Sequence, residues 1–275
     1  MPRRINKNNL WYRKVYRAYH CENCCKLLPK AIFLIIPFFL FFLLAGCVTI
    51  YNPATQKKET LLIDTRSEVS LGRNMDMQVQ SQFQVLSDPW KQNRLDNIGQ
   101  KIAAASDRQD LIYHFKIIKD AELNAFTIPG GYIYVNSGLM ERASDDELAC
   151  VIAHEIGHTA ARHTVKKIQA ILGYQIVMNI VMSANNNKST IQAMDIVFSL
   201  ASLGYGRQDE TLADKLAVKY ARKAGFNPYG MVTFFEKLKK EAEEKGANFN
   251  LVFLSSHPPI DERIKNVKNE IAKYP

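Results

Sequence analysis

The sequence predicts an α+β fold, mostly helical with a small β-sheet, as one domain over residues 66–275. Only a short region, 111–135, alternates in the manner of strands, and it does so around a Pro-Gly-Gly turn. With 275 residues, of which 47% are hydrophobic, the chain can bury a substantial core. Apolar side chains recur at helical spacing in several other stretches, of which the clearest are 67–84, 89–105, 145–159 and 207–220.

The positive charge of the chain is concentrated at its N-terminus. The formal net charge is +9, but residues 1–30 hold eight of the 36 Lys and Arg and one of the 27 Asp and Glu. This segment therefore contributes +7, and the rest of the chain contributes +2. Because the bulk of the protein is nearly neutral, we expect no nucleic-acid-binding surface.

An apolar run, 31–44, follows this basic segment and leads to Ala45, Gly46 and Cys47. A positive region before an apolar one is typical of a secretory signal. The sequence Leu-Ala-Gly-Cys at its end resembles the bacterial lipobox, in which the cysteine becomes the lipidated first residue of the mature protein. We therefore predict that residues 1–46 are a lipoprotein signal peptide and that Cys47 carries the lipid. The alternative is an uncleaved membrane anchor, because 31–50 is just long enough to cross a bilayer.

The next segments lead from the membrane to the first helices. Residues 47–65 include a polar, turn-rich stretch from Tyr51, which we interpret as a tether. Helical periodicity predicts a helix over 67–84. Asp88 and Pro89 then predict the start of a second helix, which ends near residue 105. We expect both helices to pack over the core of the domain.

A strand and a turn precede the central helix. Residues 111–118 predict one strand, and Pro-Gly-Gly at 129–131 predicts a turn into a second strand. The simpler interpretation is a hairpin. The functional interpretation is an edge strand beside the central helix, whose main-chain groups hold an extended peptide. The residues that would then contact the peptide are Asn124, Ala125, Gly130, Gly131 and Tyr132.

The central helix contains the sequence His-Glu-Ile-Gly-His from His154 to His158. Two histidines four residues apart lie on one face of a helix and can bind one Zn²⁺ from the same side. Glu155 lies beside the first of them, where its carboxylate can take a proton from a water molecule at the metal. The pattern also arises by chance, but the acidic residues 145–147 and the apolar residues after them are typical of a buried helix. Cys150, four residues before His154, is best explained as a core residue.

A catalytic zinc usually has three protein ligands and one open position. His163 is nine residues after His154, half a turn away from the metal face of a continuous helix, so we do not expect it to be a ligand. Glu210 and Asp214 share one face of a later helix. Glu210 can supply the third ligand, with Asp209 as its nearest competitor, and Asp214 can hydrogen-bond to a ligand histidine.

Two further segments complete the chain. Residues 168–204 are apolar except for a polar stretch at 183–189, which predicts two helices that pack against the core. His257 lies in Ser-Ser-His-Pro-Pro, and its simplest interpretation is a residue at the start of a helix.

Four motifs together resemble peptidase family M48, which includes the HtpX-type and CAAX-prenyl-protease-type zinc endopeptidases. The resemblance extends over roughly residues 66–270 and is greatest to the periplasmic lipoprotein branch, which is similar to the catalytic part of the mitochondrial Oma-type protease. It implies a gluzincin-type domain, with no tetratricopeptide domain after it. The motifs are Asn124-Ala-Phe with Pro129-Gly-Gly-Tyr-Ile-Tyr-Val, His154-Glu-Ile-Gly-His, Arg207-x-x-Glu-x-x-Ala-Asp, and Ser255-Ser-His-Pro-Pro.

The resemblance also implies roles for individual residues. One Zn²⁺ per chain would be held by His154, His158 and Glu210, with Glu155 as the general base. His257 would donate a hydrogen bond to the oxyanion of the reaction or, in a resting state, bind and block the zinc. Arg263 would brace the loop that carries His257 or contact the substrate.

The implied function is that of a membrane-anchored zinc endopeptidase on the periplasmic side of a bacterial envelope, as an outer-membrane lipoprotein. Its substrates would be misfolded or misassembled envelope proteins, so that it acts in quality control. The alternative from another functional class is a lipoprotein chaperone or assembly factor with a blocked zinc site and little proteolysis.

Overall fold

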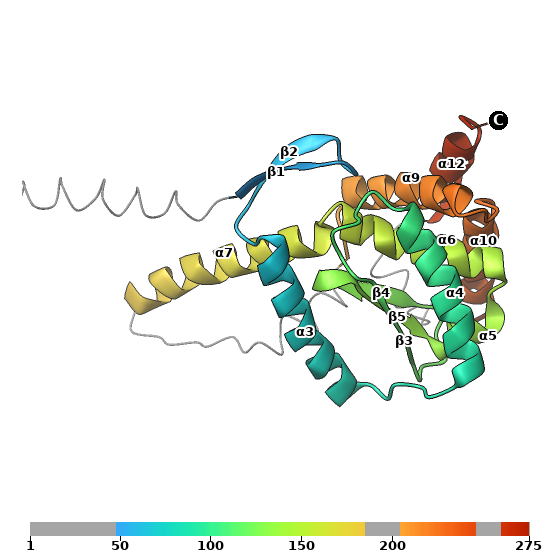
Figure 1. Ribbon diagram of the computed structural model, residues 1–275, viewed down its shortest axis with the longest axis horizontal. Helices are drawn as coiled ribbons and strands as arrows, with labels where there is room; N and C mark the ends of the chain where they lie inside the picture. Colours follow the sequence, from blue (N-terminus) through green and yellow to red (C-terminus); the bar gives the residue numbers. More distant parts are fainter. Residues whose placement is uncertain (1–47, 185–203, 246–259, 275) are drawn as a thin grey trace, which may run out of the picture. The chain divides into compact units, whose positions relative to one another are not determined.

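The computed structural model describes residues 48–184, 204–245 and 260–274 (Figure 1). Helices predominate in these residues and a small sheet accompanies them, which confirms the predicted fold class. Cys47 and His257 lie outside the described residues, as does most of the polar stretch 183–189. No helix in the described part of the chain combines the length and the apolar character that crossing a membrane requires.

The first described element is a β-hairpin. Strand β1 (Val48–Asn52) pairs antiparallel with β2 (Lys57–Leu61). Asn52 stabilises the turn between them, because its Oδ1 accepts a hydrogen bond from the Ala54 N–H at 3.0 Å and its amide donates to Glu59 at 3.1 Å. The stretch interpreted as a polar tether is thus folded over most of its length.

Both predicted early helices are present, and each has an aspartate at its N-cap. Helix α3 (Thr65–Gln82) starts at Asp64, whose side chain accepts from the Ser67 N–H. Helix α4 (Pro89–Ala105) starts where the Asp-Pro pair predicts: Asp88 accepts from the N–H groups of residues 90 and 91. An aspartate at this position satisfies amide groups that have no partner within the helix.

The sheet has three strands in the order β3-β5-β4. Strand β5 (Tyr132–Asn136) runs parallel to β3 (His114–Ile118) and antiparallel to β4 (Ala125–Ile128), to which the short η1 turn (Pro129–Gly131) connects it. The predicted hairpin is therefore confirmed. The prediction of an edge strand after the turn is wrong, because β5 is central and buried along its whole length. The edge strand that contacts the central helix is β4.

The η1 turn is held closely against α3. Gly130 has a φ of 79°, a conformation that glycine adopts without strain. A Cβ atom on Gly72 of α3 would lie 2.1 Å from the carbonyl oxygen of Pro129. The absence of a side chain at position 72 therefore lets the helix lie directly on the turn.

We expect Gly72→Ala to lower the free energy of unfolding by about 1–3 kcal/mol, because the added methyl group forces the backbones of helix and turn apart. Chemical denaturation measures this. The matched control is Gly173→Ala, since a Cβ at Gly173 has no neighbour within 4 Å. It should be neutral or slightly stabilising, because alanine favours the helix. Equal effects of the two substitutions would contradict this explanation.

Helix α6 (Asp145–Ala160) is central to the fold and starts with a capping box between Ser144 and Glu147. It contacts β4 and β5 as well as α4, α7 (His163–Ala184), α9 (Arg207–Lys223) and α10 (Gly230–Lys245). The helix is buried almost all round, which fits its run of small and apolar residues. Two shorter helices complete the described fold, α5 (Ser137–Arg142) and α12 (Ile260–Ile271).

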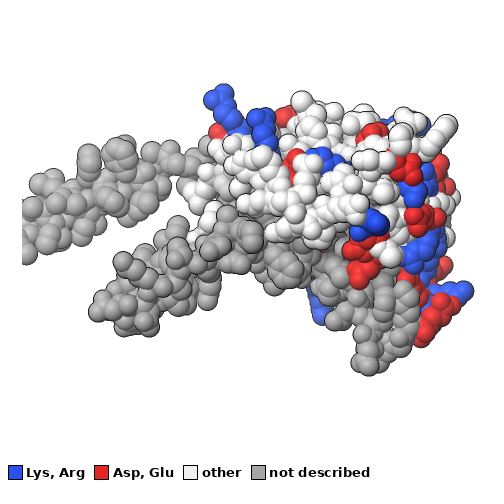
Figure 2. All heavy atoms as spheres, turned by 90° about the horizontal axis from the view of Figure 1, so that it is seen from below, with Lys and Arg blue, Asp and Glu red and all other residues white. Residues whose placement is uncertain are grey.

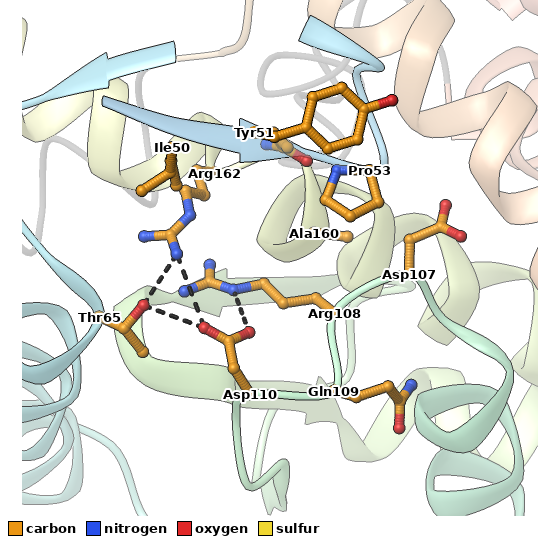
Figure 3. A pocket seen from close by; sticks show the side chains of 11 residues that line it. Ile50, Tyr51, Pro53, Thr65, Asp107, Arg108, Gln109, Asp110, Ala160 and Arg162 are labelled. Carbon is orange, nitrogen blue, oxygen red and sulfur yellow. Dashed lines mark hydrogen bonds and ion pairs between the residues drawn. The ribbon is translucent and has the colours of Figure 1, made fainter. Parts of the chain in front are cut away.

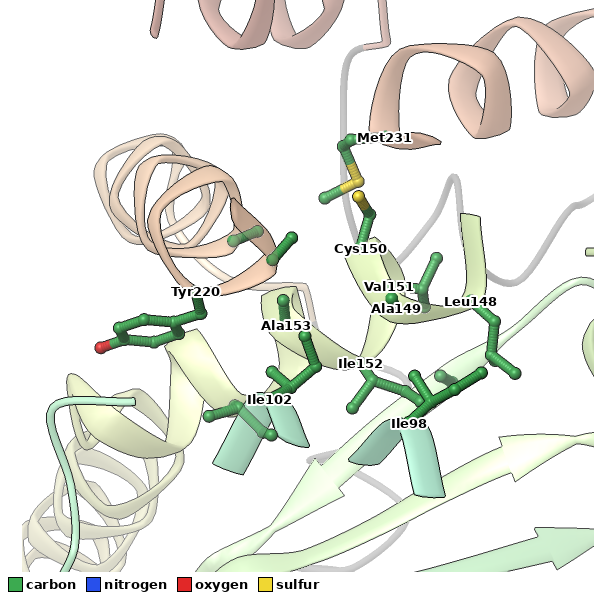
Figure 4. Close-up of a cluster of buried hydrophobic side chains, with 14 of the residues drawn as sticks. Ile98, Ile102, Leu148, Ala149, Cys150, Val151, Ile152, Ala153, Tyr220 and Met231 are labelled. Carbon is green, nitrogen blue, oxygen red and sulfur yellow. The ribbon is translucent and has the colours of Figure 1, made fainter. Parts of the chain in front are cut away.

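The main core lies around α6 (Figure 4). Ile98 of α4 and Ile152 of α6 meet on one side, and Met231 of α10 lies beside Cys150 on the other (Figure 4). Cys150 is 1% exposed, and burial raises the pKa of its thiol to about 12. Cys150 is therefore an inert core residue, as predicted.

On the outer face seen in Figure 2, Lys and Arg lie among Asp and Glu.

Candidate metal centre

Helices α6 and α9 pack closely against each other at Gly157. A Cβ atom at this position would be 3.1 Å from the carbonyl oxygen of Ala213 on α9. Because position 157 has no side chain and position 213 has only a methyl group, the two backbones come close together. This approach brings Glu210 of α9 to the two histidines of α6.

The side chains of His154, His158 and Glu210 form a buried triangle. The two Nε2 atoms are 3.0 Å apart, and the Glu210 carboxylate lies 3.5 Å from the first and 3.4 Å from the second. Two atoms bound tetrahedrally to zinc are about 3.3–3.4 Å apart, so this spacing fits such a site. Within the described residues, these three side chains make up the group of potential ligands.

The charges around the triangle also fit a divalent cation. Within the part of the chain that the structure describes, Glu155, Glu210 and Asp214 are buried together with the guanidinium of Arg263. With neutral histidines, full ionisation leaves an excess of two negative charges, which a divalent metal would neutralise. Burial and then the charge of Glu210 raise the pKa of Glu155 well above 4.5. A bound cation would act in the opposite direction.

His154 is held from behind by Asp214. The Nδ1 of His154 lies 3.0 Å from Asp214 Oδ1, so its N–H donates to the carboxylate and Nε2 remains available for a metal. Arg263 donates two hydrogen bonds to Asp214, at 2.7 and 2.9 Å, and lies 3.3 Å from Glu210. Burial opposes the ionisation of Asp214, but Arg263 and His154 outweigh it and lower its pKa to about 2. Arg263 thus braces Glu210 and Asp214 of α9.

Glu155 lies between the metal group and the sheet. It is 1% exposed, and the backbone N–H of Thr127 on β4 lies close enough to its carboxylate to oppose the rise in its pKa. The hydroxyl groups of Thr127 and Thr159 are 2.9 Å apart, which ties the edge strand to the end of α6. The edge strand therefore contacts Glu155, which follows the candidate ligand His154 in the chain and is not itself part of the triangle.

The structure places His163 beside the candidate ligand His158, a position that the sequence does not predict. Helix α6 ends at Ala160, Arg162 has a positive φ of 56°, and α7 begins at His163. The assumption of a continuous helix is therefore wrong. His163 lies 2.9 Å from His158 through the Nδ1 atoms, so it contacts a candidate ligand without joining the metal group. Asp209, the competitor for the ligand role, lies 3.3 Å from His163.

The five residues expected to contact a peptide lie in different surroundings. Ala125 is on the edge strand β4 and Asn124 immediately precedes it, whereas Tyr132 begins the central strand. Gly130 is buried against α3, and a Cβ at Gly131 would be 2.6 Å from the carbonyl oxygen of residue 112. The two glycines are thus explained by close packing, because no open surface lies beside them.

We expect the metal-free protein to lose stability in mild acid. Burial, and then Arg263, lower the pKa of His154 to about 3, and burial with His158 lowers that of His163 to about 2. Both values lie below the unfolded value of about 6.5. Their contribution to stability is therefore complete above pH 6.5 and is lost as the pH falls.

Each histidine should cost about 1.4 kcal/mol per pH unit between pH 6.5 and about 3. Urea titration of chelator-treated protein at pH 7.5, 6 and 5 measures this loss. Glu155 opposes part of this loss, because its raised pKa lets the folded state take up a proton that the unfolded state does not. The net loss should therefore be about that of one histidine, and a free energy of unfolding that stays constant or rises as the pH falls would contradict the burial of both histidines in neutral form.

Comparison with known proteins places this arrangement in a family. The model of Peptidase family M48 matches residues 89–271. The chain is 26% identical over 220 residues to the beta-barrel assembly-enhancing protease of Escherichia coli (strain K12), covering 74% of this chain and 45% of that protein. It is 30% identical over 162 residues to metalloprotease LoiP of the same strain, covering 58% of this chain and 63% of that protein.

Mitochondrial metalloendopeptidase OMA1 of Schizosaccharomyces pombe is 30% identical over 169 residues, which cover 61% of this chain and 49% of that protein. The chain thus spans about half the length of most of the relatives it matches. The family match extends over most of the chain and includes both helices of the candidate metal centre. The chain belongs to peptidase family M48.

Proposed function

We propose that this protein is a zinc-dependent endopeptidase, anchored in a bacterial cell envelope, that hydrolyses misfolded or misassembled envelope proteins. The observation that carries the proposal is the buried triangle of His154, His158 and Glu210 with Glu155 beside it. Membership of a peptidase family and similarity to metalloproteases support the same chemistry.

Zn²⁺ held by the triangle would act as a Lewis acid that polarises a peptide carbonyl and lowers the pKa of water. The residues of the chain then handle the proton. Glu155 takes it from the attacking water and delivers it to the leaving nitrogen, as a general base and then a general acid. The Thr127 N–H lies close to the carboxylate and favours its ionised form. Asp214, held by Arg263, keeps the His154 ring oriented.

The edge strand β4 offers a place for an extended substrate. The Asn136 N–H donates to the Asn124 carbonyl at 3.0 Å, and the antiparallel register continues with Phe126 opposite position 134. Hydrogen bonding to β5 alternates along such a pair, so the main-chain groups of Ala125 and Thr127 point the other way, towards α6. The Thr127 N–H already reaches Glu155. Ala125 is fully buried, so a peptide added along this edge would have to displace the groups that cover it before pairing with Ala125 and passing the general base.

The proposed anchor is the lipid on Cys47 or, alternatively, an uncleaved span over residues 31–50. The β1–β2 hairpin follows the proposed anchor directly in the sequence. The envelope clients and the quality-control role are proposed from the similarity to a beta-barrel assembly-enhancing protease. We place the protein on the periplasmic side, as an outer-membrane lipoprotein, and propose His257 as an oxyanion donor.

The test is the degradation of an unfolded polypeptide by the full-length protein in detergent, with zinc content measured in parallel. We expect cleavage that stops on chelation and returns with added zinc. If zinc-loaded protein does not cleave, His257→Ala distinguishes a blocked site, which it would activate, from a chaperone or assembly factor, which would remain inactive.

A further inference from the structure

We propose that His163 is a positioning residue for His158. It accepts a hydrogen bond from the Nδ1–H of His158 and donates from its own Nε2–H to Asp209. This chain of hydrogen bonds would fix the tautomer and the orientation of one metal ligand. The inference rests on the proposed function, because it takes Nε2 of His158 as the atom that faces the metal.

The protonation of each ring follows from the geometry. Nε2 of His158 lies within the triangle, 3.0 Å from Nε2 of His154 and 3.4 Å from Glu210, so this nitrogen must be free of a proton when a metal is bound. A neutral imidazole then carries its proton on Nδ1. That atom lies 2.9 Å from Nδ1 of His163, which must act as the acceptor.

The same reasoning extends one step further. An acceptor at Nδ1 requires that His163 carries its proton on Nε2. This atom lies 3.3 Å from Oδ1 of Asp209. An ionised carboxylate has no proton to donate, so Asp209 is the acceptor of this pair. Along the series of contacts from His158 through His163 to Asp209, each N–H group thus faces a nitrogen or oxygen that can accept its proton.

The surroundings of His158 leave its ring little freedom. The side chain is fully buried, and His163 is 3% exposed. The ring of Tyr205 is stacked on His158, with centroids 3.9 Å apart and an angle of 24° between the planes. One edge of the ring therefore faces the metal group, the other faces His163, and a face is covered by Tyr205.

The fold places His163 at this position through the break between α6 and α7. Arg162 adopts its positive φ with its guanidinium 3.0 Å from Glu68 and 2.8 Å from the Thr65 hydroxyl, both on α3. The turn directs the first side chain of α7 back towards α6. Asp209 precedes the candidate ligand Glu210 on α9, so the hydrogen bonds connect α7 to the helix that supplies the third ligand.

The two candidate histidine ligands are consequently supported in different ways. His154 donates directly to the buried Asp214, which Arg263 holds. His158 reaches a carboxylate only through a second histidine, and the side chain of Asp209 is 46% exposed. Groups that orient ligands in this manner typically change metal affinity 10- to 100-fold when they are removed.

Two substitutions separate hydrogen bonding from packing. His163→Asn retains an oxygen close to the position of Nδ1, whereas His163→Leu fills a similar space without an acceptor. Zinc affinity is measured on the full-length protein by competition with a chromophoric chelator, and Co²⁺ absorption spectra report the ligand geometry. We expect His163→Leu to weaken zinc binding about 10- to 100-fold and to alter the Co²⁺ spectrum. His163→Asn should restore most of the affinity.

Wild-type affinity in His163→Leu would overturn the proposal, and so would an equal loss in both variants, which would indicate packing alone. Asp209→Ala serves as a second test at an exposed position, with an expected loss of about three- to tenfold. If His163→Leu does not fold, an unchanged affinity in Asp209→Ala would overturn the proposed chain of hydrogen bonds. A protein that binds zinc but cleaves nothing, both as wild type and as His257→Ala, would contradict the peptidase function and leave this test valid.

Discussion

Glu155→Gln is expected to lower the rate of peptide hydrolysis by about 10²- to 10⁴-fold while zinc binding is retained. Glutamine has the shape of glutamate, but it cannot take a proton from water. Glu155 is outside the triangle of candidate ligands, so the metal group stays complete. Initial rates of cleavage of an unfolded polypeptide, with zinc content determined on the same samples, measure both properties.

The matched control is Glu141→Gln, since the Glu141 side chain is 57% exposed and forms an ion pair with Lys91. It should cleave at the wild-type rate. Cleavage by Glu155→Gln at the rate of this control would exclude Glu155 as the general base. Loss of zinc from Glu155→Gln would instead show that the residue supports the metal group itself.

Glu68→Gln is expected to lower the free energy of unfolding by about 3–5 kcal/mol, because it leaves the buried guanidinium groups of Arg108 and Arg162 with the half-exposed carboxylate of Asp110 as the remaining counter-charge. Glu68 is 1% exposed and accepts from Arg108 at 2.6 and 3.0 Å and from Arg162 at 3.0 Å. Burial, and then the charge of Arg108, already lower the pKa of Arg162. The carboxylate of Glu68 therefore holds two guanidinium groups together that would otherwise repel each other.

The effect should extend to the metal centre. Figure 3 shows Arg108 and Arg162 side by side, with Asp110, at a pocket of about 370 Å³ that β1 also lines. Arg108 donates to the carbonyl of Thr159 in the last turn of α6, at 2.9 Å. The Glu68 cluster, here defined as Glu68 with these two arginines, thus joins α3 to the end of the helix that carries both histidines.

Chemical denaturation of Glu68→Gln measures the predicted loss. The control is Lys239→Ala, which breaks an ion pair with Asp261 between side chains that are 50% and 80% exposed. Such a pair contributes about 0–1 kcal/mol. Adding Arg108→Met to Glu68→Gln should recover part of the stability, because it removes one uncompensated charge. A loss in Glu68→Gln no greater than in the control would contradict this account.

The parts of the structure that the sequence predicts well depend on local spacing. His154 and His158 face the same side because helical geometry places residues four apart on one face. The start of α4 follows from Asp88 and Pro89, since capping involves only neighbouring residues. The pairing of Glu210 with α6 needed the resemblance to a family as well, because helix periodicity does not say which helices meet.

The parts that the sequence does not predict depend on contacts between distant segments or on a local break. The positive φ of Arg162 ends the helix before His163, and no pattern in that stretch signals it. Strand β5 is central because it also pairs in parallel with β3. The alternation of side chains along a strand does not reveal this partner or its register. The Glu68 cluster joins residues 40 and 94 positions apart in the chain, so no sequence window contains it.

The most direct test of the metal centre is the zinc content of the purified protein and of Glu210→Gln, after both are equilibrated with limiting zinc and washed. Glu210 comes from a different helix than the two histidines, so its contribution tests the tertiary arrangement and not only the motif on α6. We predict one zinc ion per chain in the wild type and a loss of most of it in Glu210→Gln. A folded wild type without zinc, or a Glu210→Gln variant with wild-type zinc content, would contradict the proposed site.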